Sequence, residues 1–273
     1  MTRQRTLPGY DRRAMKIRFL GTGTGLPSRA RAPSGVLVQL GQAEGRPEEA
    51  HASEGPSLLV DCGSGTISRL VAAGFDPTRI DYIYSTHDHG DHAADLVPFM
   101  QAMDLAHRTT DLHWTAPAVM GALLNGLLQL QPWATPKTYR WVHHPAESEP
   151  YCGAGWKVRA ARTGHTRDSV GYRVDAEGRA VVISGDATYY PDLVELARGA
   201  DVVVLECSYP DQLAMAGHLT PASAGRLASE AGARHLVLTH FYPVCRMEEI
   251  AAQANKAFAE RLTLAYDGLV LEV

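Results

Sequence analysis

The chain has 273 residues, of which 45% are hydrophobic and 21% are charged, a composition typical of a globular protein with a sizeable core. It has no apolar run near the ~20 residues of a membrane helix, and its first ten residues lack the apolar centre of a signal peptide, so we expect a cytoplasmic location and no membrane partner. The net charge of −4 argues against broad, charge-driven binding of nucleic acid, although it leaves room for a local basic patch.

In the first half of the chain, short apolar runs predict strands and longer periodic segments predict helices. Residues 1–14 are basic, polar and aperiodic, so we expect a loose tail, and translation could even start at Met15. Residues 42–55 are rich in Glu, Gly and Ala and lack a pattern, which favours a loop insertion. The predicted strands are residues 15–20, 35–40, 57–61 and 82–85, and the predicted helices are 64–73, 92–106 and 117–130.

In the second half, predicted strands alternate with predicted helices. The strands are residues 156–161, 169–174, 180–184, 201–205 and 235–239, followed by a closing pair at 261–265 and 269–273. The helices are residues 191–198, 221–231 and 246–259. Two strand-rich halves, each with its own helices, predict two mixed sheets packed face to face with helices outside. Polar residues that follow the strands would then meet at the strand ends.

The four cysteines are far apart and form no CxxC pair, which suggests neither a disulfide framework nor a zinc finger. We expect all four to be small buried residues: Cys62, Cys152, Cys207 and Cys245.

The glycine-rich stretch at residues 21–25 follows a strand, as a dinucleotide-binding loop would. Its context does not fit that function, because Leu26 replaces the final glycine of the motif and prolines at 27 and 33 oppose a following helix. Glycines that let the backbone approach a metal site or a substrate phosphate fit the stretch better.

The most informative segment is His-Asp-His-Gly-Asp-His at residues 87–92, directly after a predicted strand. So many imidazoles and carboxylates need partners or a metal if they are buried. His87 and His89 can point the same way and bind one ion, whereas Asp91 and His92 turn toward a second. Imidazole and carboxylate ligands suit zinc, manganese or iron, and paired ions of this kind catalyse displacement at phosphorus or a carbonyl.

Three further polar residues end predicted strands or follow them: His165, Asp186 and His240. Each is a weak signal alone, since a single histidine after a strand is more often a surface or core residue. Their ordered occurrence after residues 87–92 is unlikely to be an accident and supplies the ligands that the segment lacks.

With this set, the chain resembles the metallo-β-lactamase-fold hydrolases, and within them the ribonuclease Z-like branch. The resemblance extends from Met15 to Val273, and it implies a single domain of mixed α/β class, a four-layered αββα sandwich. Besides the ligands, it covers residues 19–28, 59–66, 170–173, 206–208 and 218–221.

The resemblance also implies a role for each residue. One metal would be held by His87, His89 and His165, the other by Asp91, His92 and His240, and Asp186 would bridge them. The metals would be two divalent ions, zinc first, with manganese or iron possible. His218 would be an additional catalytic histidine, oriented by Glu206, although His218 could instead cap a helix and Glu206 could be a charged strand end.

Two features of the chain differ from the sequence pattern of the ribonuclease Z-like branch. Ribonuclease Z enzymes that mature tRNA commonly carry a long arm between the third histidine and the Gly-Asp motif, whereas only twenty residues join His165 and Asp186 here. The usual Asp-Cys-Gly-Glu-Gly-Thr-Gln also reads Asp-Cys-Gly-Ser-Gly-Thr-Ile at residues 61–67. Both departures point toward the arm-less relatives, which include cyclic-nucleotide phosphodiesterases and sulfatase-like enzymes.

We therefore predict a dinuclear hydrolase of small phosphodiesters such as cyclic nucleotides, in which a hydroxide between the metals attacks phosphorus. Asp91 would orient this nucleophile and His218 would assist the leaving group. One alternative is tRNA 3′-end processing by an arm-less scaffold, as a monomer or a homodimer, with a basic strip near the site. The candidates for that strip are Arg29, Arg31, Arg69, Arg162 and Arg167. Further alternatives are hydrolysis of an aryl sulfate, a carbonyl ester or a lactone. From another class of function, the chain could be a metal sensor or an inactive scaffold.

Overall fold

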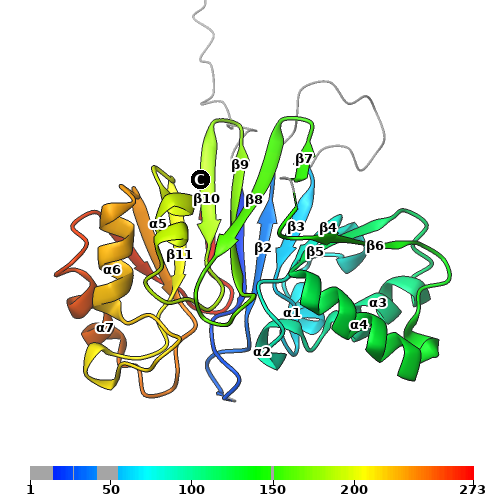
Figure 1. Ribbon diagram of the computed structural model, residues 1–273, viewed down its shortest axis with the longest axis horizontal. Helices are drawn as coiled ribbons and strands as arrows, with labels where there is room; N and C mark the ends of the chain where they lie inside the picture. Colours follow the sequence, from blue (N-terminus) through cyan, green and yellow to red (C-terminus); the bar gives the residue numbers. More distant parts are fainter. Residues whose placement is uncertain (1–14, 27, 42–54, 149–150) are drawn as a thin grey trace, which may run out of the picture.

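The computed structural model describes residues 15–26, 28–41, 55–148 and 151–273. The predicted tail at 1–14 and all but the last residue of the predicted loop insertion at 42–55 lie outside the described residues. The described chain forms two mixed sheets packed face to face, with helices on both outer faces, which confirms the predicted four-layered sandwich (Figure 1).

The first sheet has the strand order β14-β1-β2-β3-β4-β5-β6. Its strands are β1 (Lys16–Gly21), β2 (Gly35–Gln39), β3 (Ser57–Val60), β4 (Tyr82–Tyr84), β5 (Leu112–Ala116), β6 (Trp141–Pro145) and β14 (Val270–Glu272). Pairing is antiparallel from β14 to β3 and parallel from β3 to β6. The outer face is covered by α1 (Thr66–Ala72), α3 (Leu96–Leu105) and α4 (Ala118–Leu130), and α2 (Gly90–Ala93) lies at the lower edge in Figure 1.

The second sheet has the strand order β13-β12-β11-β10-β9-β8-β7. Its strands are β7 (Tyr151–Gly153), β8 (Trp156–Arg162), β9 (Val170–Ala176), β10 (Arg179–Ile183), β11 (Val202–Glu206), β12 (His235–Thr239) and β13 (Arg261–Leu264). Pairing is parallel from β13 to β10 and antiparallel from β10 to β7. Its outer face carries α5 (Pro191–Ala197), α6 (Pro221–Glu230) and α7 (Met247–Ala254) (Figure 1).

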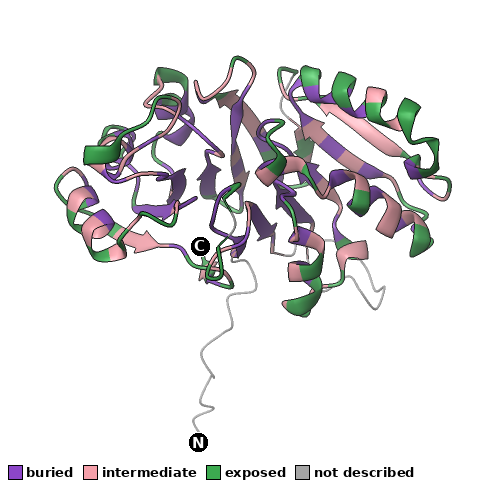
Figure 2. Cartoon of the chain, turned by 90° about the horizontal axis from the view of Figure 1, so that it is seen from below, coloured by how far each residue is buried: buried purple, intermediate pink, exposed green. Residues whose placement is uncertain are grey.

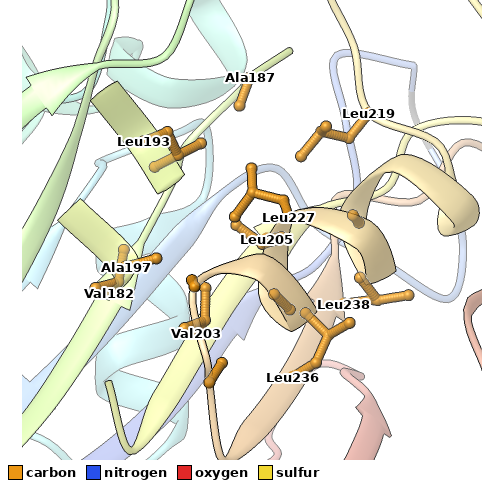
Figure 3. Close-up of a cluster of buried hydrophobic side chains, with 14 of the residues drawn as sticks. Val182, Ala187, Leu193, Ala197, Val203, Leu205, Leu219, Leu227, Leu236 and Leu238 are labelled. Carbon is orange, nitrogen blue, oxygen red and sulfur yellow. The ribbon is translucent and has the colours of Figure 1, made fainter. Parts of the chain in front are cut away.

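Three apolar clusters hold the layers together, one between the sheets and one under each helical layer. Figure 3 shows the cluster in which Val203 and Leu205 of β11 and Leu236 of β12 meet Leu227 of α6. Each such side chain contributes about 1.5–3 kcal/mol to the free energy of unfolding when it is fully buried. Most strands inside each sheet are buried along most of their length, the edge strands β6, β7, β13 and β14 are only partly buried, and exposed residues gather on the outer helices (Figure 2).

Several sequence predictions need correction. The helix predicted at 92–106 is two helices, α2 and α3, and β5, β6 and β7 were not predicted. The predicted closing strands, β13 and β14, lie in different sheets. Cys62 and Cys207 are buried as expected, but Cys152 is exposed on β7 and Cys245 is only partly buried.

Short 3-10 turns complete the described elements: η1 (Pro77–Arg79), η2 (Pro132–Ala134) and η3 (Asp211–Leu213). Among the described helices, none is both long enough and apolar enough to cross a membrane.

Candidate metal centre

The candidate site lies at one edge of the sandwich, where the carboxyl ends of strands from both sheets converge. The segment 87–92 follows β4 of the first sheet. His165, Asp186 and His240 each follow a strand of the second sheet, β8, β10 and β12 respectively. These three strands run in the same direction, so their following loops meet at one edge. Figure 2 looks onto this edge.

A first group of side chains combines His87, His89, His165 and Asp186, whose potential ligand atoms lie within 4.8 Å of one another. The Nε2 atom of His165 lies 3.3 Å from His89 Nδ1 and 3.7 Å from Asp186 Oδ2. The Nε2 atom of His87 lies 3.9 Å from the same Asp186 oxygen.

A second group combines Asp91, His92 and His240. The Nε2 atoms of His92 and His240 are 3.2 Å apart, and Asp91 Oδ2 lies 3.3 Å from His240 Nε2. The other oxygen of Asp186, Oδ1, lies 3.1 Å from His92 Nε2 and 3.2 Å from His240 Nε2. Asp186 therefore faces both groups, one oxygen toward each.

These separations fit ligands around shared centres. Atoms bound to a tetrahedral ion at 2.0–2.2 Å lie about 3.4 Å apart, close to the distances between the atoms in each group. Two of the inward-facing atoms, His87 Nε2 and Asp186 Oδ1, are buried without a hydrogen-bond partner. Buried polar atoms of native proteins normally have a partner, so these two atoms fit a bound cation.

The hydrogen bonds around the rings set which nitrogen faces inward. The Nδ1 atom of His165 donates to Gly217 O at 2.7 Å, and that of His92 contacts Asp61 Oδ2 at 2.6 Å. The Nδ1 atoms of His87 and His240 contact the hydroxyls of Thr86 and Ser208 at 3.0 Å. When Nδ1 carries the proton in this way, the lone pair of Nε2 is available to a metal. His89 differs, because its Nδ1 faces His165.

The electrostatics of the site favour bound positive charge. Burial, assisted by the neighbouring His92, lowers the pKa of His87 to about 2, so this ring is neutral. Burial opposes protonation of His92, but Asp186 and then Asp61 outweigh it and raise the pKa of His92 well above its ordinary value. The buried carboxylates thus attract a cation to this position.

His218 and Glu206 form a pair beside the two groups. Glu206 ends β11 and is 1% exposed, and its Oε1 lies 2.8 Å from His218 Nδ1. Burial lowers the pKa of His218, but the hydrogen bond with Glu206 and the negative charges of Glu206, Asp186 and Asp91 together outweigh it and raise the pKa overall. The helix cap that could have accounted for His218 is formed by Thr220 and Ser223 at the start of α6 instead.

All nine predicted site residues therefore lie together, and the structure adds others that the sequence did not single out. The hydroxyl of Ser208 donates to Glu206 Oε2 at 2.8 Å and contacts both His218 and His240. Asp61 accepts from the Thr86 backbone N–H at 2.8 Å in addition to its contact with His92. Both residues lie inside stretches that carried the family resemblance, which was the available signal.

The glycine-rich loop at residues 21–25 is not followed by a helix in the described residues. A Cβ atom added to Gly25 would lie 3.5 Å from the Asp91 carboxyl carbon, so this glycine does border the site. Glycine is needed at position 21 for a different reason. A Cβ atom added to Gly21 would lie only 1.8 Å from Pro33 O and would collide with it.

Comparisons with known proteins identify the family of the chain. Residues 57–241 match the family described as the β-lactamase superfamily domain. The chain is 29% identical to a probable metallo-hydrolase, YhfI, of Bacillus subtilis, across 94% of this chain and 100% of the relative. It is 27% identical to a ribonuclease Z of Acaryochloris marina, across 95% of this chain and 98% of the relative.

Solved structures give the same result. The crystal structure of Bacillus subtilis YhfI superposes with a TM-score of 0.78 at 26% identity, covering 95% of this chain and 100% of that one. The short form of human tRNase Z superposes with a TM-score of 0.73 at 26% identity, covering 94% and 98%. The chain therefore belongs to the β-lactamase superfamily, as a metal-dependent hydrolase of its ribonuclease Z-like branch.

Proposed function

We propose that the chain is a dinuclear phosphodiesterase that acts on small phosphodiesters such as cyclic nucleotides. The observation that supports this most strongly is the position of Asp186, whose two oxygens face separate groups of histidines. In this proposal His87, His89 and His165 hold one divalent ion, Asp91, His92 and His240 hold the other, and Asp186 bridges them. Zinc is our first choice, with manganese or iron as alternatives.

Two divalent ions in such a site lower the pKa of water and neutralise charge on phosphoryl oxygens. The side chains supply orientation and proton transfer. The carboxylate of Asp91 is partly exposed, so it can accept a hydrogen bond from the attacking water. The Nδ1 atom of His218 is held by Glu206, which leaves Nε2 to donate a proton to the departing oxygen.

The preference for small substrates rests on the segment between His165 and Asp186. β9 and β10 form a hairpin closed by Glu177 and Gly178, both with positive φ, and this tight turn leaves no protruding arm. Without such an arm, few contacts far from the reaction could position a large RNA.

Processing of tRNA is the second candidate, because relatives named ribonuclease Z match nearly the whole chain. The predicted basic strip supports it only in part. Arg31 donates to Thr22 Oγ1 and Ala265 O, and Arg69 pairs with Asp267 at 2.9 Å, so both have intramolecular partners. Arg29, Arg162 and Arg167 are exposed and could contact phosphates.

An activity panel on the metal-reconstituted protein tests the proposal. The substrates are bis-p-nitrophenyl phosphate, cyclic nucleotides, an aryl sulfate, a lactone and precursor tRNA. We expect hydrolysis of the phosphodiesters with the highest kcat/KM for a small one. A dominant activity on the sulfate or lactone would contradict phosphorus as the reacting centre.

The role of His218 makes a separate prediction. Replacing His218 by Ala should lower kcat by about 10²–10⁴-fold, the usual contribution of a general acid, while metal content stays unchanged. Replacing His89 by Ala should reduce metal content. Metal analysis beside kinetics would check both, and an equal loss of metal in the two variants would show that the assigned roles are wrong. The cytoplasmic location and the homodimer remain predictions.

A further inference from the structure

Two tyrosines that the proposed reaction does not use stack on each other beside the site. The ring centroids of Tyr209 and Tyr242 are 4.5 Å apart with an interplanar angle of 19°. Their backbones are tied together, because the Tyr242 N–H donates to Ser208 O at 3.3 Å. The chain segments that leave β11 and β12 therefore run side by side and hold the two rings in register.

The stacked pair borders the proposed proton donor and one proposed metal ligand. The Tyr209 ring lies 6.2 Å from the His218 ring, and the Tyr242 ring lies 6.4 Å from the His240 ring, both in edge-on arrangements. Neither tyrosine is fully buried. A substrate group that leaves phosphorus toward His218 would thus meet this aromatic pair.

Exposed apolar side chains occur in the same chain segments as the two tyrosines and His218. Leu213 is 48% exposed, Met215 is 51% exposed and Val244 is 46% exposed. Met215 lies in the loop that ends at His218, whose backbone N–H donates to Met215 O, and Val244 lies two residues after Tyr242. A stacked aromatic pair fits a planar, weakly hydrated group better than a phosphate backbone, and the exposed apolar residues of its chain segments agree with that.

We propose that Tyr209 and Tyr242 form an aromatic platform that holds a planar ring on the leaving-group side of the substrate. This inference rests on the proposed phosphodiesterase function and narrows its substrates to esters of an aryl alcohol or a nucleoside. Aryl alcohols and nucleosides share one chemical feature, a flat π-face that stacks on tyrosine. Stacking of one base on an aromatic side chain changes affinity by about tenfold or more.

Binding rather than turnover gives the direct test. Calorimetric titration of the metal-reconstituted protein would compare phenylphosphonate with methylphosphonate, which carry the same anionic group with and without a ring. A second pair, adenosine 5′-monophosphate and ribose 5-phosphate, tests the nucleoside source. We expect the ring-bearing member of at least one pair to bind about tenfold more tightly, and the pair that shows the larger preference identifies the source.

Variants then assign the preference to the platform. Tyr242→Leu and Tyr209→Leu should each reduce the preference for the ring-bearing ligand to within about twofold. Tyr242→Phe should keep this preference, because the aromatic ring remains. Tyr266→Leu, at a tyrosine that is 58% exposed and does not belong to the stacked pair, serves as the control. Absence of any preference in the unaltered protein, or an unchanged preference in both leucine variants, would refute the platform.

Hydrolysis of bis-p-nitrophenyl phosphate, measured in parallel, separates the two proposals. If the preference for a ring depends on the tyrosines but no hydrolysis occurs, the platform is supported and the proposed reaction is contradicted. If hydrolysis occurs but the preference does not depend on the tyrosines, the reaction is supported and the platform is contradicted.

Discussion

At the scale of single residues, the candidate site is organised by partners that lie behind the ligands. His92, His165, His87 and His240 each contact an oxygen through Nδ1 and present Nε2 to the centre. Asp61, one of these partners, contacts both His92 and Thr86. It also has a φ of 60°, a conformation that aspartate and asparagine tolerate better than most residues.

Asp61→Asn is therefore an informative substitution, because asparagine keeps the size and the backbone conformation but removes the charge. We expect metal affinity to fall by about 10–100-fold, the usual effect of losing the partner of a ligating histidine. Competition with a chelator would measure the dissociation constant.

Asp95→Asn provides the matched control, because Asp95 accepts a hydrogen bond from the Ile67 N–H at the start of α1 instead. Equal losses of metal affinity in the two variants would mean that Asp61 acts only through general stability.

The ligands could be predicted at this scale because histidine and aspartate at such close spacing are typical of a metal site. The role of Ser208 was not predicted, although its stretch carried the family resemblance, because only the fold brings Glu206, His218 and His240 around its hydroxyl. Tyr209 and Tyr242 were missed for the same reason, because the two rings that stack are far apart in the sequence.

At the scale of elements, the strands that were not predicted are β5, β6 and β7, and each contains polar or partly exposed residues. β6 contains two histidines and a proline, and it lies at the edge of its sheet, where proline is tolerated. β5 carries a histidine and a threonine that alternate with buried residues. The helix predicted at 92–106 is interrupted because the Asp95 N–H donates to Cys62 O rather than continuing α2.

The first residue of β12 makes a prediction about stability and pH. His235 is buried, and its Nε2 lies 2.8 Å from Thr263 Oγ1 on the neighbouring β13. Burial, with a smaller effect of Arg261, lowers the pKa of His235 to about 4. Because the pKa in the folded protein is below the ordinary value of about 6.5, the neutral ring favours folding above pH 6.5.

This contribution to the free energy of unfolding should be lost as the pH falls from 6.5 toward 4. His235→Gln cannot titrate, so the difference in unfolding free energy between variant and unaltered protein should shift in favour of the variant over that range. Urea denaturation at a series of pH values would show it. A difference that stays constant with pH would mean that His235 does not contribute to acid sensitivity.

At the scale of the whole molecule, both halves of the sandwich contribute to one site. The first sheet supplies residues 87–92, and the second supplies the remaining proposed ligands. The halves are also joined at this edge, where the Phe241 N–H donates to Thr22 O and Arg31 lies over the Phe241 ring at 4.6 Å. These contacts support our proposal that residues 15–273 form a single domain.

The overall arrangement of layers followed from the sequence, because two strand-rich halves with helices have few compact solutions. The separation of β13 and β14 into different sheets did not, since their spacing alone also fits a hairpin. Only the pairing of β14 with β1 and of β13 with β12 shows that the chain crosses between sheets near its end.

The size of the preferred substrate depends on how much of the molecular surface can contact it. Recognition of a tRNA uses many phosphate contacts, and each neutralised phosphate makes affinity more dependent on salt. The described part of the chain has a tight hairpin in place of an arm, and the exposed arginines of the predicted strip are Arg29, Arg162 and Arg167. Small phosphodiesters should therefore be cleaved at a kcat/KM at least comparable to that for precursor tRNA, with little dependence on salt.

Kinetics with both substrates at low and physiological salt would test this expectation. Arg162→Gln combined with Arg167→Gln should leave cleavage of bis-p-nitrophenyl phosphate unchanged, because neither arginine belongs to the proposed centre. If precursor tRNA were preferred by several orders of magnitude, and if its cleavage fell steeply with salt and in the double variant, the exposed arginines would be an RNA-binding surface. The ribonuclease function would then replace the small-substrate phosphodiesterase, because distant phosphate contacts would supply the binding energy that an arm supplies in relatives that have one.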